Sequence, residues 1–250
     1  MSLINRVEIS NFIPLFGPDA SDDEWMPKFR YNLFDFGSQS AAISMDNGTG
    51  KTSFSDAVIG LLTRDRGLCR KTREKMAPSS CGTYSHIRVE LKVPRQASGN
   101  DMFVVRGHEV PGETWVFGMC GFRGKPETLS FYYYCGRLED CPIAEVDGFK
   151  VSLYHNSDFR EIRSRVSGLK FNVTTSDWLE AMTPHFPPHL LKQMAKFQAM
   201  GGGDTASSIY DVKPQRGERY DAAFFYSVIA PEVMAGAMSG DEDDEGDEHY

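Results

Sequence analysis

The chain has 250 residues, of which 40% are hydrophobic and 25% charged, and its formal net charge is −8. This length can bury a substantial core, as one large domain or two small ones, and the composition is ordinary for a soluble globular protein. The last ten residues, DEDDEGDEHY, hold seven acids, so the rest of the chain is close to neutral. The body is therefore not a bulk polyanion binder, and any nucleic-acid surface must be a local patch.

The first predicted elements are strands. Apolar and aromatic residues favour a strand over 3–12 and a second over 29–36, with an acidic loop between them. A short apolar strand over 41–43 is expected next, followed by a polar loop. A helix then begins, with an apolar face over 54–62.

The loop before this helix holds the last part of a phosphate-binding P-loop, in the strand–loop–helix order that the motif needs. Its residues are Asn47, Gly48, Thr49, Gly50, Lys51, Thr52 and Ser53. Glycine lets backbone N–H groups wrap a polyphosphate closely, and the following helix points its N-terminus at the anion. We expect Lys51 to reach the β- and γ-phosphates of ATP and the Thr52 hydroxyl to bind Mg²⁺.

The motif departs from the full pattern at one position, because Met45 stands where a glycine is required five residues before Gly50. The departure concerns the first turn of the loop and leaves the Lys51-Thr52 end intact. The alternative interpretation is a glycine turn leading into a helix, with Lys51 a solvated charge.

A basic run, RDRGLCRKTREK, covers residues 64–75 and has six basic and two acidic residues. Such a run is either a solvated face or a contact to the DNA backbone, where basic side chains displace counterions from phosphates. The candidate DNA contacts are Arg64, Arg66, Arg70, Lys71 and Arg73.

From residue 85 onward the pattern changes to period two, which predicts an antiparallel meander. Strands are expected over 86–93, 102–106, 114–122, 129–135 and 149–154, and the Tyr132–Tyr134 run is interpreted as sheet packing. Helices are expected over 156–168, 176–184, 187–201 and 218–229. Residues 236–250 are expected to be a disordered acidic tail.

Several classes of protein are disfavoured. The five cysteines form no C-x-x-C pair and read as reduced thiols of a cytosolic protein. His185 and His189 have metal-ligand spacing, but Pro187 and Pro188 between them make a metal pair improbable. No signal peptide and no membrane span is predicted, so a cytoplasmic location is expected.

Two parts of a hydrolytic site are missing from the sequence. No run of four apolar residues ends in Asp or Glu, and no L-S-G-G-like signature follows the P-loop. The chain is therefore expected to bind a nucleotide but to hold only half of a composite site.

The order of these segments resembles the N-terminal head lobe of SMC-like bacterial condensins, in the MukB, MksB and JetC (Wadjet) branch. The resemblance rests on INRVEISNF, the aromatic strand, the P-loop and KMAPSSCGTYSHIRVEL, and on GLKF, SDWLEAM and GERYDAAFFYSVIAPEVM. It covers residues 1–235 and implies an α/β fold with α+β character. That fold is a P-loop NTPase half-domain of the ABC/SMC head type, with an antiparallel β-meander and a C-terminal helical region.

In that family, the N- and C-terminal lobes form one ATPase head, and two heads sandwich ATP. The resemblance implies ATP and Mg²⁺ as cofactors, with Asn47–Ser53 as the phosphate cradle. The implied partners are a C-terminal lobe, a second head, a kleisin subunit and DNA bound without sequence preference, at the nucleoid in the cytoplasm. ATP hydrolysis would need the C-terminal lobe. Chromosome segregation and plasmid defence both stay open, as do a stand-alone nucleotide-binding or interaction module and a RecF-like repair ATPase head.

Overall fold

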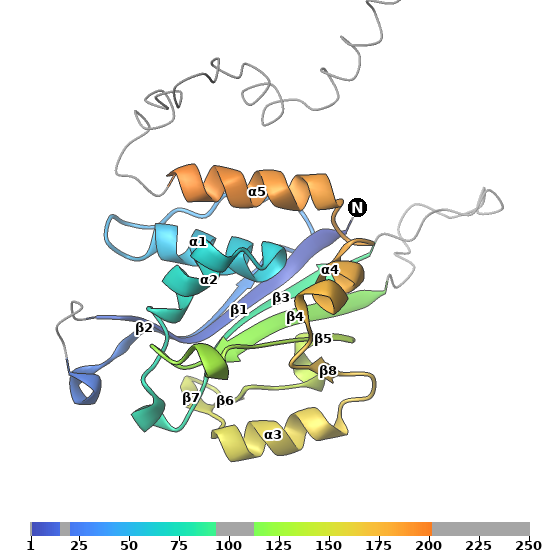
Figure 1. Cartoon of the computed structure of the whole chain (residues 1–250). Coiled ribbons are helices and arrows are strands. Elements are labelled where there is room, and N and C mark those ends of the chain that lie inside the picture. Colours follow the sequence, from blue (N-terminus) through green and yellow to red (C-terminus); the bar gives the residue numbers. More distant parts are fainter. Residues whose placement is uncertain (1, 16–20, 94–112, 202–250) are drawn as a thin grey trace, which may run out of the picture. The chain divides into compact units, whose positions relative to one another are not determined.

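A six-stranded antiparallel sheet carries the fold (Figure 1). The computed structural model describes residues 2–15, 21–93 and 113–201. The strand order is β2-β1-β3-β4-β5-β8, and each neighbouring pair is antiparallel. The strands are β1 (Leu3–Pro14), β2 (Pro27–Asp35), β3 (Ser85–Lys92), β4 (Thr114–Gly121), β5 (Ser130–Cys135) and β8 (Lys170–Phe171). A separate two-stranded sheet consists of β6 (Ala144–Asp147) and β7 (Lys150–Leu153).

Helices cover both faces of this sheet. The helices are α1 (Lys51–Thr63), α2 (Arg66–Arg73), α3 (Asn156–Arg165), α4 (Thr175–Met182) and α5 (Pro188–Gly201). Figure 1 shows α1, α2, α4 and α5 on one side of the sheet, and α3 with the β6–β7 hairpin on the other. α5 lies over α1, and Gln198 of α5 donates a hydrogen bond of 2.8 Å to the buried Asp56 of α1. α1 thus forms the first helical layer on this face of the sheet, and α5 lies over it as a second layer.

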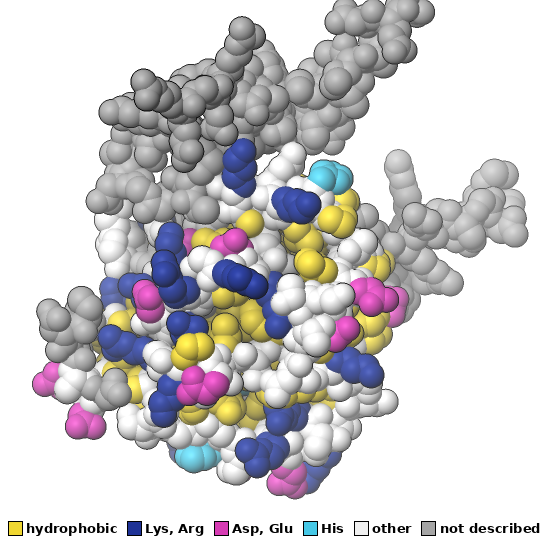
Figure 2. All heavy atoms as spheres, in the orientation of Figure 1, with side chains coloured by type: hydrophobic (Ala, Val, Ile, Leu, Met, Phe, Trp, Pro, Cys, Tyr) yellow, Lys and Arg dark blue, Asp and Glu magenta, His cyan; other side chains and the backbone are white. Residues whose placement is uncertain are grey.

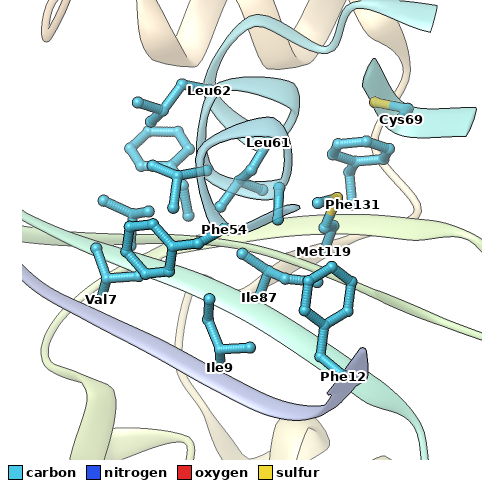
Figure 3. Close-up of a cluster of buried hydrophobic side chains, with 14 of the residues drawn as sticks. Val7, Ile9, Phe12, Phe54, Leu61, Leu62, Cys69, Ile87, Met119 and Phe131 are labelled. Carbon is cyan, nitrogen blue, oxygen red and sulfur yellow. The ribbon is translucent and has the colours of Figure 1, made fainter. Parts of the chain in front are cut away.

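The main core lies between the sheet and α1 (Figure 3). Alternate residues of β1 and β3 point to one face, and most of them are apolar, for example Val7, Ile9 and Ile87. Phe54 and Leu61 of α1 pack against them, and all five side chains are less than a tenth exposed. Burial of each large apolar side chain contributes about 1.5–3 kcal/mol, so this layer holds α1, and with it the loop that precedes α1, against the sheet.

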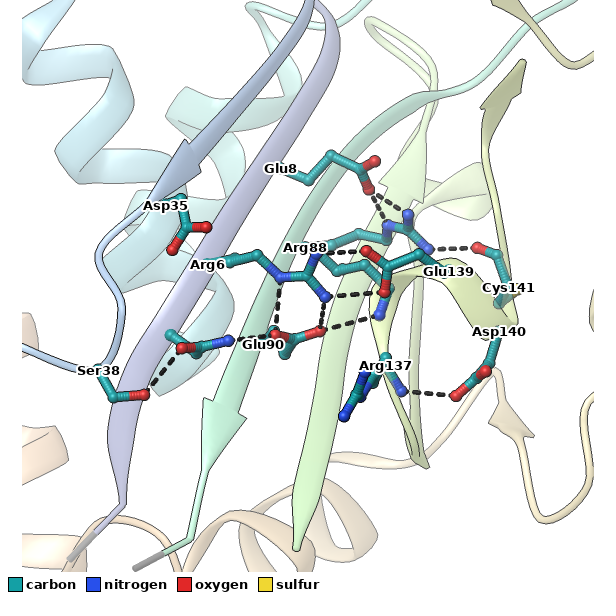
Figure 4. Close-up of polar contacts among 12 residues, drawn as sticks. Arg6, Glu8, Asp35, Ser38, Arg88, Glu90, Arg137, Glu139, Asp140 and Cys141 are labelled. Carbon is teal, nitrogen blue, oxygen red and sulfur yellow. Dashed lines mark hydrogen bonds and ion pairs between the residues drawn. The ribbon is translucent and has the colours of Figure 1, made fainter. Parts of the chain in front are cut away.

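The opposite face of β1 and β3 is charged and nevertheless buried (Figure 4). Arg88 forms an ion pair with Glu8, and Tyr31 donates a hydrogen bond of 2.9 Å to the same carboxylate. Glu90 accepts a hydrogen bond of 3.0 Å from the backbone N–H of Leu138. Burial lowers the pKa of Arg88, but the nearby Glu8 carboxylate and the other acidic groups around the guanidinium together outweigh burial, and the net pKa is raised. Each buried charge therefore has a partner, which is the condition for placing it inside a protein.

The start of the chain is tied to the end of the α4 region. The backbone N–H of Ser2 donates to the carbonyl of His185 over 3.1 Å. The Ser2 hydroxyl also lies 2.9 Å from Nδ1 of His185. These contacts fix the beginning of β1 next to a segment 183 residues away.

The structure confirms the predicted mixture of strands and helices, as an α+β arrangement. The β-meander is present as β3, β4 and β5. Tyr132 and Tyr134 of β5 are buried in a second hydrophobic cluster, on the face of the sheet opposite the main core, which also contains Phe159 of α3. The sequence did not predict α2, β6 or β8. The strand expected over 102–106, the helix expected over 218–229 and the boundary at 235 lie outside the described residues. The finer assignment to a P-loop head stays a prediction.

Candidate functional site

The candidate phosphate site lies where α1 begins. Residues 47–50 form a tight turn, and the helix starts at Lys51. Gly50 is the N-cap residue and has a left-handed backbone with φ of 105°, which favours glycine. The seven residues from Asn47 to Ser53 are therefore brought together as one loop and the first helical turn.

The strand predicted over 41–43 is wrong. These residues are exposed and belong to no strand of the described chain. Two of the three are alanines, which form strands poorly, and within the described ranges no strand lies beside them to supply a ladder of hydrogen bonds. The loop is consequently reached from β2 by a stretch that is neither helix nor strand, in which residues 39–44 are exposed.

Two backbone carbonyl groups of the loop accept hydrogen bonds from Lys51 and from Thr49. Nζ of Lys51 donates to the carbonyl of Met45 over 2.8 Å and lies 3.3 Å from Oδ1 of Asn47. The backbone N–H and the hydroxyl of Thr49 both donate to the carbonyl of Asp46, over 3.3 and 2.6 Å. The Lys51 amine is thus held across the loop, in position to exchange a carbonyl for another oxygen acceptor.

Apolar contacts from β1 and β2 support the loop from below. A Cβ atom on Gly50 would lie 2.6 Å from Cδ1 of Ile13 and 3.6 Å from the ring of Phe29. Ile13 itself has φ of 61°, a conformation that costs energy in a β-branched residue. Met45 packs against the main core. The residue that departs from the P-loop pattern therefore anchors the loop to the core.

The start of α1 has the features of an anion-binding helix N-terminus. No side chain caps the helix, and its first turn carries no acid. The first hydrogen bond after the cap is from the backbone N–H of Phe54 to the carbonyl of Gly50. The N–H groups of Lys51, Thr52 and Ser53 precede it and have no helical acceptor. Together with the helix dipole, they favour a phosphate at this end.

The carboxylates near the loop do not form a metal site. Asp46 is exposed. Asp56 is buried and accepts a hydrogen bond from Gln198. Within residues 2–15, 21–93 and 113–201, no group of three His, Cys, Asp or Glu side chains is placed to hold a metal ion. Thr52, at the start of the helix, is the predicted Mg²⁺ ligand that the loop itself supplies.

The basic run forms α2 and the residues on either side of it. Arg64 is engaged within the protein: it donates to the carbonyl of Thr174 over 2.6 Å, and its guanidinium lies 4.3 Å from the ring centre of Phe131. Burial lowers the pKa of Arg64. Three residues of the run, Arg66, Arg70 and Lys71, are exposed, whereas Arg73 is half-buried.

Figure 2 shows lysine and arginine side chains spread over the displayed face of the molecule, including the region of α1 and α2, with acidic side chains between them. Arg70, Lys71 and Arg73 occupy the last turn of α2, where positive charge also stabilises the helix dipole. Stabilisation of the α2 dipole is therefore a structural role for these residues, and the contact with DNA stays a prediction.

Sequence reasoning missed two residues of the site, Lys28 and Ile13. Nζ of Lys28 donates to the carbonyl of Gly48 over 2.7 Å, and Ile13 packs on Gly50. Both residues come from earlier strands, more than a dozen positions before the motif, and neither belongs to a local pattern. Only the pairing of β1 with β2 brings them to the loop.

Two comparisons with known proteins, against family models and against curated sequences, found no relative of this chain. Among the described helices, none has both the length and the apolar character needed to cross a membrane.

Proposed function

We propose that the chain is the ATP-binding N-terminal lobe of an SMC-like ATPase head, of the kind that organises DNA in bacterial condensins. One observation carries this proposal: a glycine loop with a lysine leads directly into a helix that has neither a side-chain cap nor an acid in its first turn. That combination supplies free N–H donors, a favourable dipole and a mobile positive charge at one point.

In this proposal, the residues Asn47–Ser53 wrap the β- and γ-phosphates of ATP. Lys51 releases the Met45 carbonyl and binds phosphate oxygens, and the Thr52 hydroxyl binds Mg²⁺. A bound Mg²⁺ would supply positive charge that offsets the negative charge of the phosphates. The protein's contribution at this stage is to position the polyphosphate.

The proposal includes a second lobe, from the same or a partner chain. The exposed stretch 41–43 precedes the loop without a strand partner in the described structure, and a strand of another lobe would pair with it. The same lobe would bring the carboxylates that hold Mg²⁺ and orient water. A second head across ATP, a kleisin subunit and DNA complete the proposed assembly, in chromosome segregation or plasmid defence.

A stand-alone interaction module is the competing proposal. The observation that favours it is the position of the Lys51 amine, which already has two acceptors inside the loop. In that case the Lys51 amine is satisfied by acceptors of the loop itself, and the loop needs no bound ligand. A RecF-like repair head would share the nucleotide site and differ in its partners.

Calorimetric titration with ATP and Mg²⁺ tests the proposal. The wild-type chain should bind weakly, and Lys51→Ala should abolish binding. Lys150→Ala serves as the control, because Lys150 is an exposed lysine on β7 and its loss changes the net charge equally. Equal ATP binding by wild type and Lys51→Ala, or no binding at all, would refute the nucleotide site and favour the interaction module.

ATP turnover gives a second test. The isolated chain should not hydrolyse ATP, since positioning of water and metal is most of the catalysis in phosphoryl transfer. Sustained turnover that requires Lys51, in a pure sample, would show that the chain holds an acidic catalytic residue of its own and needs no second lobe.

A further inference from the structure

Lys28 extends the candidate site beyond the motif. It is the second residue of β2 and is exposed, and its Nζ lies 2.7 Å from the Gly48 carbonyl. Gly48 has φ of 77°, and a Cβ atom placed on it would meet no atom within 4 Å. The loop is therefore open to a ligand at Gly48, next to the amine of Lys28.

Lys28 and Lys51 each donate a hydrogen bond from the side-chain amine to a backbone carbonyl of the loop. Lys51 donates to the carbonyl of Met45, and Lys28 donates to the carbonyl of Gly48. An ammonium group has three N–H donors, and in the described part of the chain one donor of Lys28 is used, by Gly48. The Lys28 amine thus has donors left for a further acceptor.

The charges of the loop indicate that this further acceptor is a phosphate oxygen of a polyphosphate. Asp46 lies in the loop and offsets the single positive charge of Lys51. A nucleoside triphosphate carries several negative charges, so a loop with no net charge attracts it only through N–H groups and the helix dipole. Lys28 makes the loop net positive.

We propose that Lys28 is a second phosphate-binding residue, which exchanges the Gly48 carbonyl for a phosphate oxygen when a nucleoside triphosphate binds. This inference rests on the proposed nucleotide site. In it, Lys28 favours polyphosphates over monophosphates, because its charge acts on the phosphate chain and not on the nucleoside.

The test compares Lys28→Met with the control Lys150→Met, using ATP, ADP, AMP and tripolyphosphate with Mg²⁺ in calorimetry. A charge-assisted hydrogen bond to an exposed lysine is expected to account for about a tenfold change in affinity. Lys28→Met should therefore weaken ATP and tripolyphosphate binding about tenfold and leave AMP binding unchanged, and Lys28→Arg should restore most of the loss.

Other outcomes would overturn the inference. If Lys28 only supports the loop through Gly48, Lys28→Met should lower the melting temperature of the ligand-free chain and weaken all four ligands equally. If ATP binding depends on Lys51 but is the same in Lys28→Met and wild type, the inference is wrong and the nucleotide site stands. If the wild type binds none of the four ligands, the proposed nucleotide site and the proposed role of Lys28 are both wrong.

Discussion

Replacing Arg88 with methionine should destabilise the protein by about 3–5 kcal/mol, because the charge of Glu8 would remain inside the protein without its partner. Arg88 is 1% exposed and Glu8 is 3% exposed. Besides the ion pair, Arg88 donates to the carbonyl of Cys141, and that acceptor would also lose its donor. The loss is a large part of the 5–15 kcal/mol that typically holds a domain folded.

A double-mutant cycle isolates the ion pair. Glu8→Leu alone leaves the Arg88 charge buried and should cost about as much as Arg88→Met alone. The double variant removes both charges, so it leaves only the Tyr31 hydroxyl and the Cys141 carbonyl without partners, at about 1–3 kcal/mol each. It should therefore be less destabilised than the sum of the single variants by about 2 kcal/mol or more.

Urea unfolding at pH 7.5 measures these values. With a slope of about 2–3 kcal/mol per molar urea, a loss of about 4 kcal/mol lowers the midpoint by roughly 1.5–2 M. Arg165→Met is the matched control, because the Arg165–Glu161 pair is exposed on both sides and should change stability by less than about 1 kcal/mol. Additive single losses, or a loss below about 1 kcal/mol for Arg88→Met, would refute the reasoning.

Three further predictions concern other parts of the chain. Burial lowers the pKa of His86 well below 6.5, so the unfolded chain takes up a proton that the folded chain does not, and stability falls as the pH drops below about 6.5. His86→Phe should remove up to about 1.4 kcal/mol per pH unit of that slope, as read from urea midpoints at pH 7.5, 6.0 and 5.0; an unchanged slope would contradict it. Gly118→Ala should cost about 1–3 kcal/mol or more, since its Cβ would lie 2.4 Å from the ring of the fully buried Tyr132, and thermal unfolding without a lower midpoint would argue against it. Reversing Arg70, Lys71 and Arg73 to Glu should weaken DNA binding by an assembled head, more at low salt than at high salt, and leave ATP binding intact; a gel shift with unchanged affinity at both salt concentrations would end the DNA-contact hypothesis.

Local patterns predicted most of the fold because they reflect burial on one face. The alternation in β3 and β4 and the helical spacing in α1 each mark an apolar face that the sheet or the helix must cover. The strand over 41–43 was wrong because a short apolar stretch forms a strand only when another strand lies beside it, and the local sequence carries no information about the neighbour. α2 escaped prediction because half of its eight residues are basic and only Leu68, Cys69 and Thr72 are buried.

In the candidate site, too, the sequence predicted the residues that are consecutive and missed those that only the fold brings near. Asn47–Ser53 could be found from the sequence because consecutive residues form the loop and the helix start. The contributions of Lys28 and Ile13 depend on where β1 and β2 end in space. Met45 shows the difference most directly: as a departure from a motif it reads as a defect, but the fold uses it as an apolar anchor.

The tie between Ser2 and His185 has a consequence for synthesis on the ribosome. At about 5–20 residues per second, roughly 10–40 s separate the appearance of the two residues. Once β3, β4 and β5 have been made, β1 can pair with β2 and β3, but its beginning still lacks the partner that fixes it, and the rings of Phe117 and Phe131 lack the cover of Trp178. The nascent sheet therefore presents an aromatic surface to the cell until the α4 segment emerges, and a chaperone that binds exposed aromatic residues would find its target in this window.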